Sequence, residues 1–214
     1  IETTALISSQ SNWQRSTETG SSNAFGETGK MKSQARTSSS SWCFSECTSN
    51  PNVARVMSRM EEVTSLPRTN HEDMQVLKCK SPYCGYCNDG GWCYYILYCT
   101  DEIGQQYTTH HDHAAIDSSR PSGARSLTFL LYLSDVEEGG ETDFPNIGIT
   151  VKPRRGKAVL WPNTLDSDPQ MIDERMYHRA LPVLKGVKYA ANAWIHAYDY
   201  QKSDLWGCTG TMPV

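Results

Sequence analysis

The second half of the sequence is built from short apolar runs separated by glycine, proline and aspartate. The runs are SLTFLLYL at 126–133, ITVKP at 149–153, KAVLW at 157–161 and KYAANAWIH at 188–196. Short apolar runs between turn-forming residues are typical of strands in a sandwich or jelly-roll barrel. GG at 139–140 and RRG at 154–156 are expected to form hairpin turns. The sequence therefore predicts a mainly β fold.

The clearest helix is predicted between residues 51 and 66. Its apolar positions recur on one helical face, and they are Val53, Val56, Met57, Met60 and Val63. Pro51 suits the first turn of a helix, and Pro67 marks its end. We expect this helix to flank the strands, which gives an α+β composition, and to carry no chemistry. MQVLK at 74–78 is expected to begin another strand.

Charge and hydropathy exclude two classes of partner. Charged residues make up 21% of the chain and the formal net charge is -4, whereas a nucleic-acid binder normally shows a clustered basic excess. No apolar run approaches the roughly 18 to 20 residues needed to span a bilayer. We therefore expect no nucleic-acid partner and no membrane segment. The chain begins at Ile1 without a leader, so we expect a fragment or processed chain whose targeting signal is missing.

The segment YTTHHDH at 107–113 places three histidines and an aspartate close together. On a strand, alternate side chains share a face, so His110 and Asp112 would point one way while His111 and His113 point the other. One imidazole and one carboxylate are two ligands of a facial triad, which a histidine from a distant strand would complete. Such a triad leaves coordination positions open and suits non-haem Fe(II) with a bidentate co-substrate and dioxygen.

Among the remaining histidines, His178 is best placed for the third ligand because it directly precedes an apolar strand. Lys188 follows ten residues later and could pair with the distal carboxylate of a dicarboxylate bound to the iron. The H-x-D triplet alone is a weak signal, because such triplets arise by chance. A histidine cluster on the surface is the alternative interpretation.

Several blocks resemble one enzyme family in the same order along the chain. They are YTTHHD, SLTFLLYLSDVEEGGETDFP, VKPRRGKAVLWPN, HRALPVLKGVKYAANAWIH and DLWGCTG. They closely resemble the catalytic domain of eukaryotic prolyl 4-hydroxylases, which are Fe(II)/2-oxoglutarate-dependent dioxygenases. FGETG and ARTSSSSWC look like its N-terminal portion, so the resemblance covers most of residues 24 to 210. The patterns Y-x-x-H-x-D and H-x-x-x-P-V-x-x-G-x-K are the strongest evidence for this family resemblance.

The resemblance implies a double-stranded β-helix, or jelly-roll, core with helices packed on its outside. It implies that His110, Asp112 and His178 bind the iron and that Lys188 pairs with 2-oxoglutarate, which makes these four the catalytic residues. The remaining implied contacts are Tyr107 and Thr128 for the co-substrate, and Arg125, Trp194 and His196 for the substrate peptide.

The implied activity is hydroxylation of proline in a peptide or protein, with dioxygen consumed and 2-oxoglutarate converted to succinate. Ascorbate is the expected reductant, and the endoplasmic reticulum or secretory pathway is the expected location, which the eight cysteines favour. The alternatives are a hydroxylase of another peptidyl residue and a catalytically silent interaction domain. His113 stands where many relatives carry a substrate-contacting tyrosine, which bears on substrate preference. No oligomeric state is predicted.

A cysteine-rich stretch at 79–99 departs from the family pattern. Its cysteines are Cys79, Cys84, Cys87, Cys93 and Cys99. Translated intron, or an error in the gene model, is the favoured interpretation, because the flanking segments would join well without the stretch. A Cys₄ zinc site built on Cys84 and Cys87 is second, and a disulfide-bonded loop is third. We therefore predict three parts: an N-terminal part of the catalytic domain at 1–78, an insert at 79–99 and the β-helix core at 100–214.

Overall fold

The computed structural model describes residues 38–44, 46–80, 106–113 and 120–201, together with the backbone of five short strands. Those strands are β1 (Gln14–Arg15), β2 (Thr17–Ser22), β3 (Thr28–Lys32), β6 (Gly85–Cys87) and β7 (Cys93–Tyr95). β2 pairs with β3 and β6 pairs with β7, each as a two-stranded antiparallel sheet. The side chains of Cys84, Cys87, Cys93 and Cys99 lie outside the described residues, so the three interpretations of the insert stay predictions.

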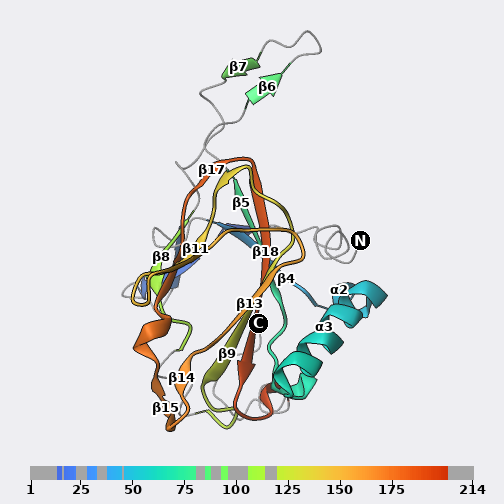
Figure 1. Cartoon of the computed structure of the whole chain (residues 1–214), viewed down its shortest axis with the longest axis vertical. Helices are drawn as coiled ribbons and strands as arrows, with labels where there is room; N and C mark the ends of the chain where they lie inside the picture. Colours follow the sequence, from blue (N-terminus) through green and yellow to red (C-terminus); the bar gives the residue numbers. More distant parts are fainter. Residues whose placement is uncertain are drawn as a thin grey trace.

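A six-stranded antiparallel sheet forms the larger layer of the molecule, in the order β1-β4-β5-β18-β9-β13 (Figure 1). Its strands after β1 are β4 (Ser39–Trp42), β5 (Gln75–Lys80), β9 (Arg125–Tyr132), β13 (Ala158–Pro162) and β18 (Val187–His196). The predicted strands at 74–78, 126–133, 157–161 and 188–196 are thereby confirmed. Cys79 and Lys80 are part of β5, so the regular sheet continues into the first residues of the predicted insert.

A four-stranded sheet lies against one face of the six-stranded sheet, and its strands follow the order β12-β11-β16-β8. Its strands are β8 (Tyr107–His110), β11 (Thr142–Phe144), β12 (Ile149–Val151) and β16 (His178–Ala180). Two further two-stranded sheets pair β10 (Glu138–Gly139) with β17 (Val183–Lys185), and β14 (Thr164–Leu165) with β15 (Asp168–Ile172). The strand predicted at 149–153 is confirmed as β12.

Both hairpin-turn predictions are wrong. Gly139 belongs to β10, which pairs with β17, and Gly140 donates its N–H to the Pro182 carbonyl at 2.9 Å. Glycine is needed at 139 because a Cβ there would clash with the Pro182 carbonyl oxygen. The RRG turn leads from β12 in the smaller sheet to β13 in the larger one. Turn residues encode a reversal of the chain, but they do not encode which sheet the next strand joins.

The helices in the described part of the chain are α2 (Glu46–Ser49), α3 (Pro51–Thr64) and the 3₁₀ helices η1 (Arg68–Asn70) and η3 (Glu174–Met176). The side chain of Asn50 accepts the Asn52 N–H at 3.0 Å and caps the start of α3. Ser65 ends it in the left-handed conformation with φ 56°. The helix predicted at 51–66 is thus confirmed, with its last turn ending earlier. No helix in the described part of the chain is long and apolar enough to cross a membrane.

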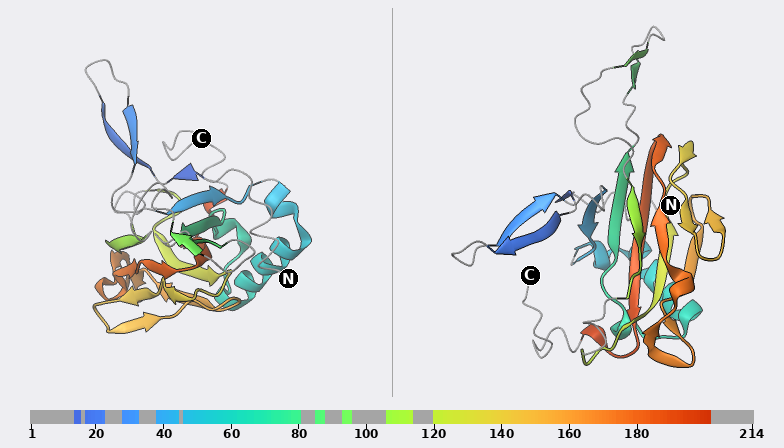
Figure 2. Two further views of the ribbon diagram at one scale, coloured as in Figure 1. Left: turned by 90° about the horizontal axis from the view of Figure 1, so that it is seen from above. Right: turned by 90° about the vertical axis from the view of Figure 1, so that its left-hand side faces the viewer.

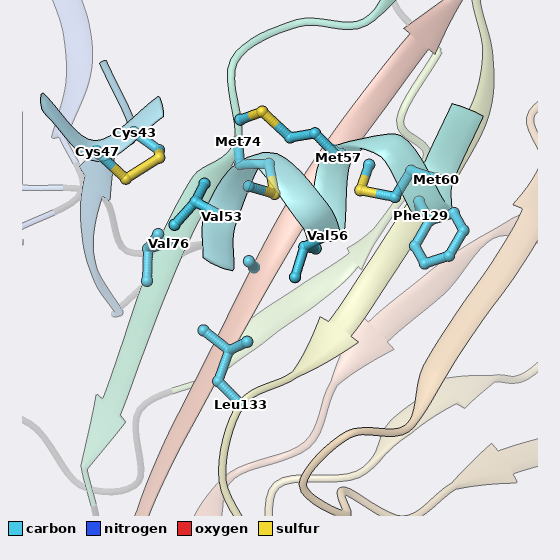
Figure 3. Packing of buried hydrophobic residues seen from close by; sticks show 12 residues of the cluster. Cys43, Cys47, Val53, Val56, Met57, Met60, Met74, Val76, Phe129 and Leu133 are labelled. Carbon is cyan, nitrogen blue, oxygen red and sulfur yellow. A yellow bond between two sulfur atoms is a disulfide. The ribbon is translucent and has the colours of Figure 1, made fainter. Parts of the chain in front are cut away.

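Helices α2 and α3 lie on one side of the six-stranded sheet, and β8 and β11 lie on the other (Figures 1 and 2). We call the helix side the outer face and the opposite side the inner face. The outer face carries the main apolar core, in which α3 packs on the sheet (Figure 3). Its members include Val53, Val56, Met57, Met60, Met74, Val76, Phe129, Leu133, Ala191, Ala193 and the disulfide-bonded pair Cys43–Cys47. Val63 is 61% exposed, so the buried face of α3 is narrower than predicted.

Candidate metal centre

The structure brings together one ligand atom each from His110, Asp112 and His178, all within 4.8 Å of one another. His178 at the start of β16 is the direct partner of His110 at the end of β8. Asp112 lies beyond the end of β8, in a bend. Strand alternation therefore does not place Asp112 next to His110, although the sequence argument relied on it. The chain leaves the strand, and the bend returns the carboxylate to the histidines.

The hydrogen bonds of the two histidines define which ring nitrogen each one offers. The Nδ1 atom of His110 lies 2.7 Å from the Thr108 carbonyl, and that of His178 lies 2.9 Å from the Met176 carbonyl. Both Nδ1 atoms therefore donate, which leaves a lone pair on each Nε2 atom. Each Nε2 faces an Asp112 oxygen at 3.6 Å. When both imidazoles are neutral, two Nε2 lone pairs and a carboxylate converge, and this donor set fits a divalent metal ion.

Asp112 is held in place from the six-stranded sheet. Its side chain is buried, and the hydroxyl of Thr128 in β9 donates to its Oδ2 at 2.7 Å. The Thr128 oxygen in turn accepts from the Asn163 amide at 2.9 Å. Burial alone would raise the pKa of Asp112, but His178, His110 and the Thr128 hydrogen bond lower it below the ordinary value of 3.8. The carboxylate is therefore ionised and fixed in one orientation.

Aromatic rings surround both histidines. Tyr107 stacks on the His110 ring with a centroid distance of 3.5 Å. Trp161 meets the His178 ring edge to face at 4.8 Å, and Phe144 lies 5.6 Å from it. Packed rings of this kind fix the orientation of the imidazoles and limit the access of water. Asn163, Trp161 and Phe144 were not predicted as site residues, although the polar residue directly after the apolar KAVLWP run was a signal for Asn163.

The metal centre opens onto a cavity that Lys188 also lines. His110, His178, Tyr107 and Lys188 all border this cavity. Lys188 is 4% exposed, and its ammonium group makes no hydrogen bond or ion pair with any described residue. Burial lowers the pKa of Lys188 from the ordinary 10.5, and Cys79 and Glu141 oppose part of that effect. A buried cation that borders a cavity is suited to an anionic ligand.

The predicted substrate contacts form a separate cluster around Glu72. Arg125 donates to the Glu72 carboxylate through Nε at 2.5 Å and Nη2 at 3.0 Å. The Nε2 atom of His196 lies 2.8 Å from the same carboxylate. The Arg125 guanidinium also lies 4.1 Å from the centroid of the Trp194 ring. Trp194 and His196 are buried, so their contact with a substrate stays a prediction, and Glu72 is the member that the sequence did not reveal.

The remaining histidines have other partners. His111 places Nε2 3.1 Å from the Asp173 carbonyl, and its Nδ1 accepts the backbone N–H of His113 at 3.0 Å. His71 places Nε2 3.3 Å from the Leu66 carbonyl. None of the three belongs to the ligand group formed by the described residues.

Comparison with known proteins agrees with this geometry. Residues 93–196 match the family model of the 2OG-Fe(II) oxygenase superfamily. The chain is 34% identical over 176 residues to prolyl 4-hydroxylase subunit alpha-1 of Rattus norvegicus, covering 79% of this chain and 28% of the relative. It is 31% identical over 193 residues to probable prolyl 4-hydroxylase 9 of Arabidopsis thaliana, covering 83% and 59%. The chain therefore spans less than two thirds of the length of these curated relatives.

Solved structures share the architecture. A viral collagen prolyl hydroxylase from Paramecium Bursaria Chlorella virus-1, solved as a 2OG complex, aligns with a TM-score of 0.58 and 26% identity, covering 76% of this chain and 80% of that one. A prolyl hydroxylase from Trichoplax adhaerens aligns with a TM-score of 0.53 at 16% identity, covering 95% and 78%, and supports the fold alone. The predicted mainly β fold around a double-stranded β-helix is confirmed.

The fold, the donor set and the match over residues 93–196 agree with those of the 2OG-Fe(II) oxygenase superfamily. Within that superfamily the chain is prolyl 4-hydroxylase-like, as the sequence resemblance predicted.

Proposed function

We propose that this chain is an Fe(II)- and 2-oxoglutarate-dependent dioxygenase that hydroxylates proline in a peptide or protein. One observation carries the proposal: His110 and His178, which converge with the Asp112 carboxylate, border the same cavity as the buried ammonium of Lys188. This arrangement suits a metal chelated by one end of a dicarboxylate whose other end pairs with Lys188. The relatives named prolyl 4-hydroxylases support the reaction and the substrate class.

We assign a separate role to each residue of the site. His110, Asp112 and His178 would hold the iron, and Thr128 orients Asp112 through its 2.7 Å hydrogen bond. We therefore assign Thr128 to the support of a ligand rather than to a co-substrate contact. Lys188 would bind the distal carboxylate of 2-oxoglutarate. When bound, Fe(II) supplies the oxidative chemistry that couples decarboxylation of 2-oxoglutarate to hydroxylation of a C–H bond.

Burial of the metal ligands and of Lys188 supports the proposed oxidative reaction. Asp112, His178 and Lys188 are buried, and aromatic rings pack against both imidazoles. A dry site strengthens the electrostatic attraction between the Lys188 ammonium and a carboxylate, and it protects reactive species from side reactions with water.

The secretory pathway and ascorbate complete the proposal. The disulfide between Cys43 and Cys47 lies in the core and supports an oxidising compartment such as the endoplasmic reticulum. Ascorbate is proposed as the reductant, by analogy with the family that the sequence resembles.

The first test is an anaerobic titration of the full chain with Fe(II) and 2-oxoglutarate, in which the visible charge-transfer band of the chelate is recorded. We expect a band in the wild type and none in His178→Ala. A variant that lacks residues 81–99 keeps Cys79 and Lys80 in β5. A band in this shortened chain would show that the insert is dispensable for the site. Absence of the band from both chains would overturn the assignment of the site.

The second test measures turnover on a panel of peptides. We expect succinate release coupled to the addition of one oxygen atom to proline-containing peptides, and no such addition when proline is replaced by alanine. Hydroxylation of a different residue would redefine the substrate class. A charge-transfer band without any coupled turnover on the panel would support a catalytically silent interaction domain instead.

A further inference from the structure

The thiol of Cys79 lies beside Lys188 in the lining of the cavity. Cys79 in β5 is the direct partner of Lys188 in the antiparallel pairing of β5 with β18. Side chains of direct partners share a face of the sheet, with Cβ atoms about 4.5–5.5 Å apart. Both side chains border the cavity, where Leu77 and Ala190 form the next pair along the same strands. Cys79 is 6% exposed, so its remaining accessible surface is small.

A second, independent observation marks this part of the cavity as a ligand site. Lys188 is nine-tenths buried, and within the described ranges nothing forms an ion pair or hydrogen bond with its ammonium. The direct pairing of Cys79 with Lys188 places the thiol and the ammonium side by side on one face of the sheet. An anion bound by Lys188 would therefore also approach the Cys79 sulfur.

We propose that Cys79 forms one wall of the pocket that receives the distal carboxylate of the dicarboxylate co-substrate, and that it is a modification site for small thiol-directed electrophiles. The proposal rests on the proposed function, because 2-oxoglutarate is the dicarboxylate in question. A methylthio group on Cys79 occupies the space that the distal carboxylate needs. Bound co-substrate and modified thiol therefore exclude one another.

The chemistry of the modification is simple. The Cys79 thiol loses its proton to solvent, and the thiolate attacks the sulfenyl sulfur of methyl methanethiosulfonate. A new S–S bond forms, the S–S bond of the reagent breaks, and methanesulfinate leaves with the electron pair. The neighbouring ammonium of Lys188 favours the thiolate that attacks. Dithiothreitol reverses the modification by thiol–disulfide exchange.

The test uses the full chain with Fe(II) under anaerobic conditions, so that 2-oxoglutarate binds without turnover. The chain is treated with methyl methanethiosulfonate with and without saturating 2-oxoglutarate, and the rate of modification of each cysteine is followed by peptide mass mapping. We expect 2-oxoglutarate to slow modification of Cys79 at least about tenfold, in proportion to its occupancy. Modification of Cys79 at the same rate in both samples, while the charge-transfer band is present, would overturn the inference and leave the proposed function intact.

A second measurement separates a pocket wall from a remote effect. Fully modified chain should bind 2-oxoglutarate at least about tenfold more weakly than untreated chain, because the added group overfills the pocket, and dithiothreitol should restore the affinity. In Cys79→Ala the affinity, whatever its starting value, should not change on treatment. A treatment effect that persists in Cys79→Ala would assign it to another cysteine and overturn the inference. Absence of 2-oxoglutarate binding in untreated chain would overturn the proposed function and the inference together.

Discussion

The two faces of the six-stranded sheet use the same strands for opposite purposes. On the outer face, β18 presents Ala191 and Ala193, which are fully buried in the apolar core beneath α3. On the inner face, the alternate residues of the same strand include Lys188, Asn192 and His196. Two of these, Lys188 and Asn192, border the cavity.

This difference shows how a small domain can carry buried charge. Apolar burial on the outer face favours folding by roughly 25 cal/mol per Å² of apolar surface. Burial of the Lys188 ammonium on the inner side opposes folding until an anion neutralises it. Substitutions in the apolar core of the outer face should therefore lower stability and leave ligand affinity alone. Substitutions on the inner side should weaken ligand binding, and removal of the Lys188 ammonium should raise stability.

The largest effect is expected on the inner side, from Asp112→Ala. Loss of the only carboxylate in the described ligand group should remove iron-dependent decarboxylation of 2-oxoglutarate, a loss greater than the ~10–100-fold typical of outer-shell changes. Decarboxylation measured as succinate release checks this. The matched control is Asp166→Ala at an exposed aspartate, which should retain activity. Wild-type turnover in Asp112→Ala would show that the metal is bound elsewhere.

Met60→Ala tests the outer face. Met60 is 2% exposed and packs in the core beneath α3, so its truncation should lower the free energy of unfolding by about 2–5 kcal/mol. Urea denaturation measures the loss, and the affinity of the folded protein for 2-oxoglutarate should not change. Val63→Ala on the exposed side of the same helix should alter stability by less than about 0.5 kcal/mol. Weaker ligand binding in Met60→Ala would show that the two faces are coupled.

Thr128→Val tests the support of the metal ligand. The change removes the donor to Asp112 and the acceptor for Asn163 while keeping the shape of the side chain. Affinity for Fe(II), measured by competition with a chelator, should fall about 10–100-fold. Thr150→Val is the matched control, because Thr150 donates to a different carboxylate, Asp143, at 2.6 Å. Equal iron affinity in both variants would refute the role assigned to Thr128.

The smallest effect is expected from Lys188→Met, and it concerns stability. Removal of a buried ammonium should raise the free energy of unfolding of the ligand-free chain by roughly 1 kcal/mol. The folded-state pKa of Lys188 lies below the ordinary 10.5, so between these two values the unfolded chain binds more protons. Wild-type stability should therefore rise with pH across that window, relative to Lys188→Met.

Denaturation at a series of pH values measures this difference. Lys152→Met, at an exposed lysine, should keep the wild-type pH profile. Identical profiles for the wild type and Lys188→Met would show that the ammonium is not destabilised by burial.

The elements of the fold could be predicted because apolar runs and caps are local signals. The strands at 126–133 and 188–196, and the helix at 51–66, each follow from residues within the segment itself. The order of the strands could not be predicted in this way. The placement of β18 between β5 and β9 depends on contacts between segments that are far apart in sequence.

The candidate site also combines features that local sequence signals predict with features that depend on distant segments. The sequence argument grouped His178 with His110 because His178 directly precedes an apolar strand, and the family resemblance pointed to the same residues. The approach of Asp112 was expected for the wrong physical reason, since a bend and the Thr128 hydroxyl position it rather than strand alternation. Glu72 could not be found at all, because its partner His196 lies 124 residues away in the sequence.

The central position of β18 also has a consequence for synthesis of the chain on the ribosome. Strands β5 and β9 emerge well before β18, the strand that pairs with both. Until β18 emerges, each of them leaves an open edge, and such edges can pair with other chains. A nascent chain that stalls before residue 187 is therefore a prime substrate for chaperones.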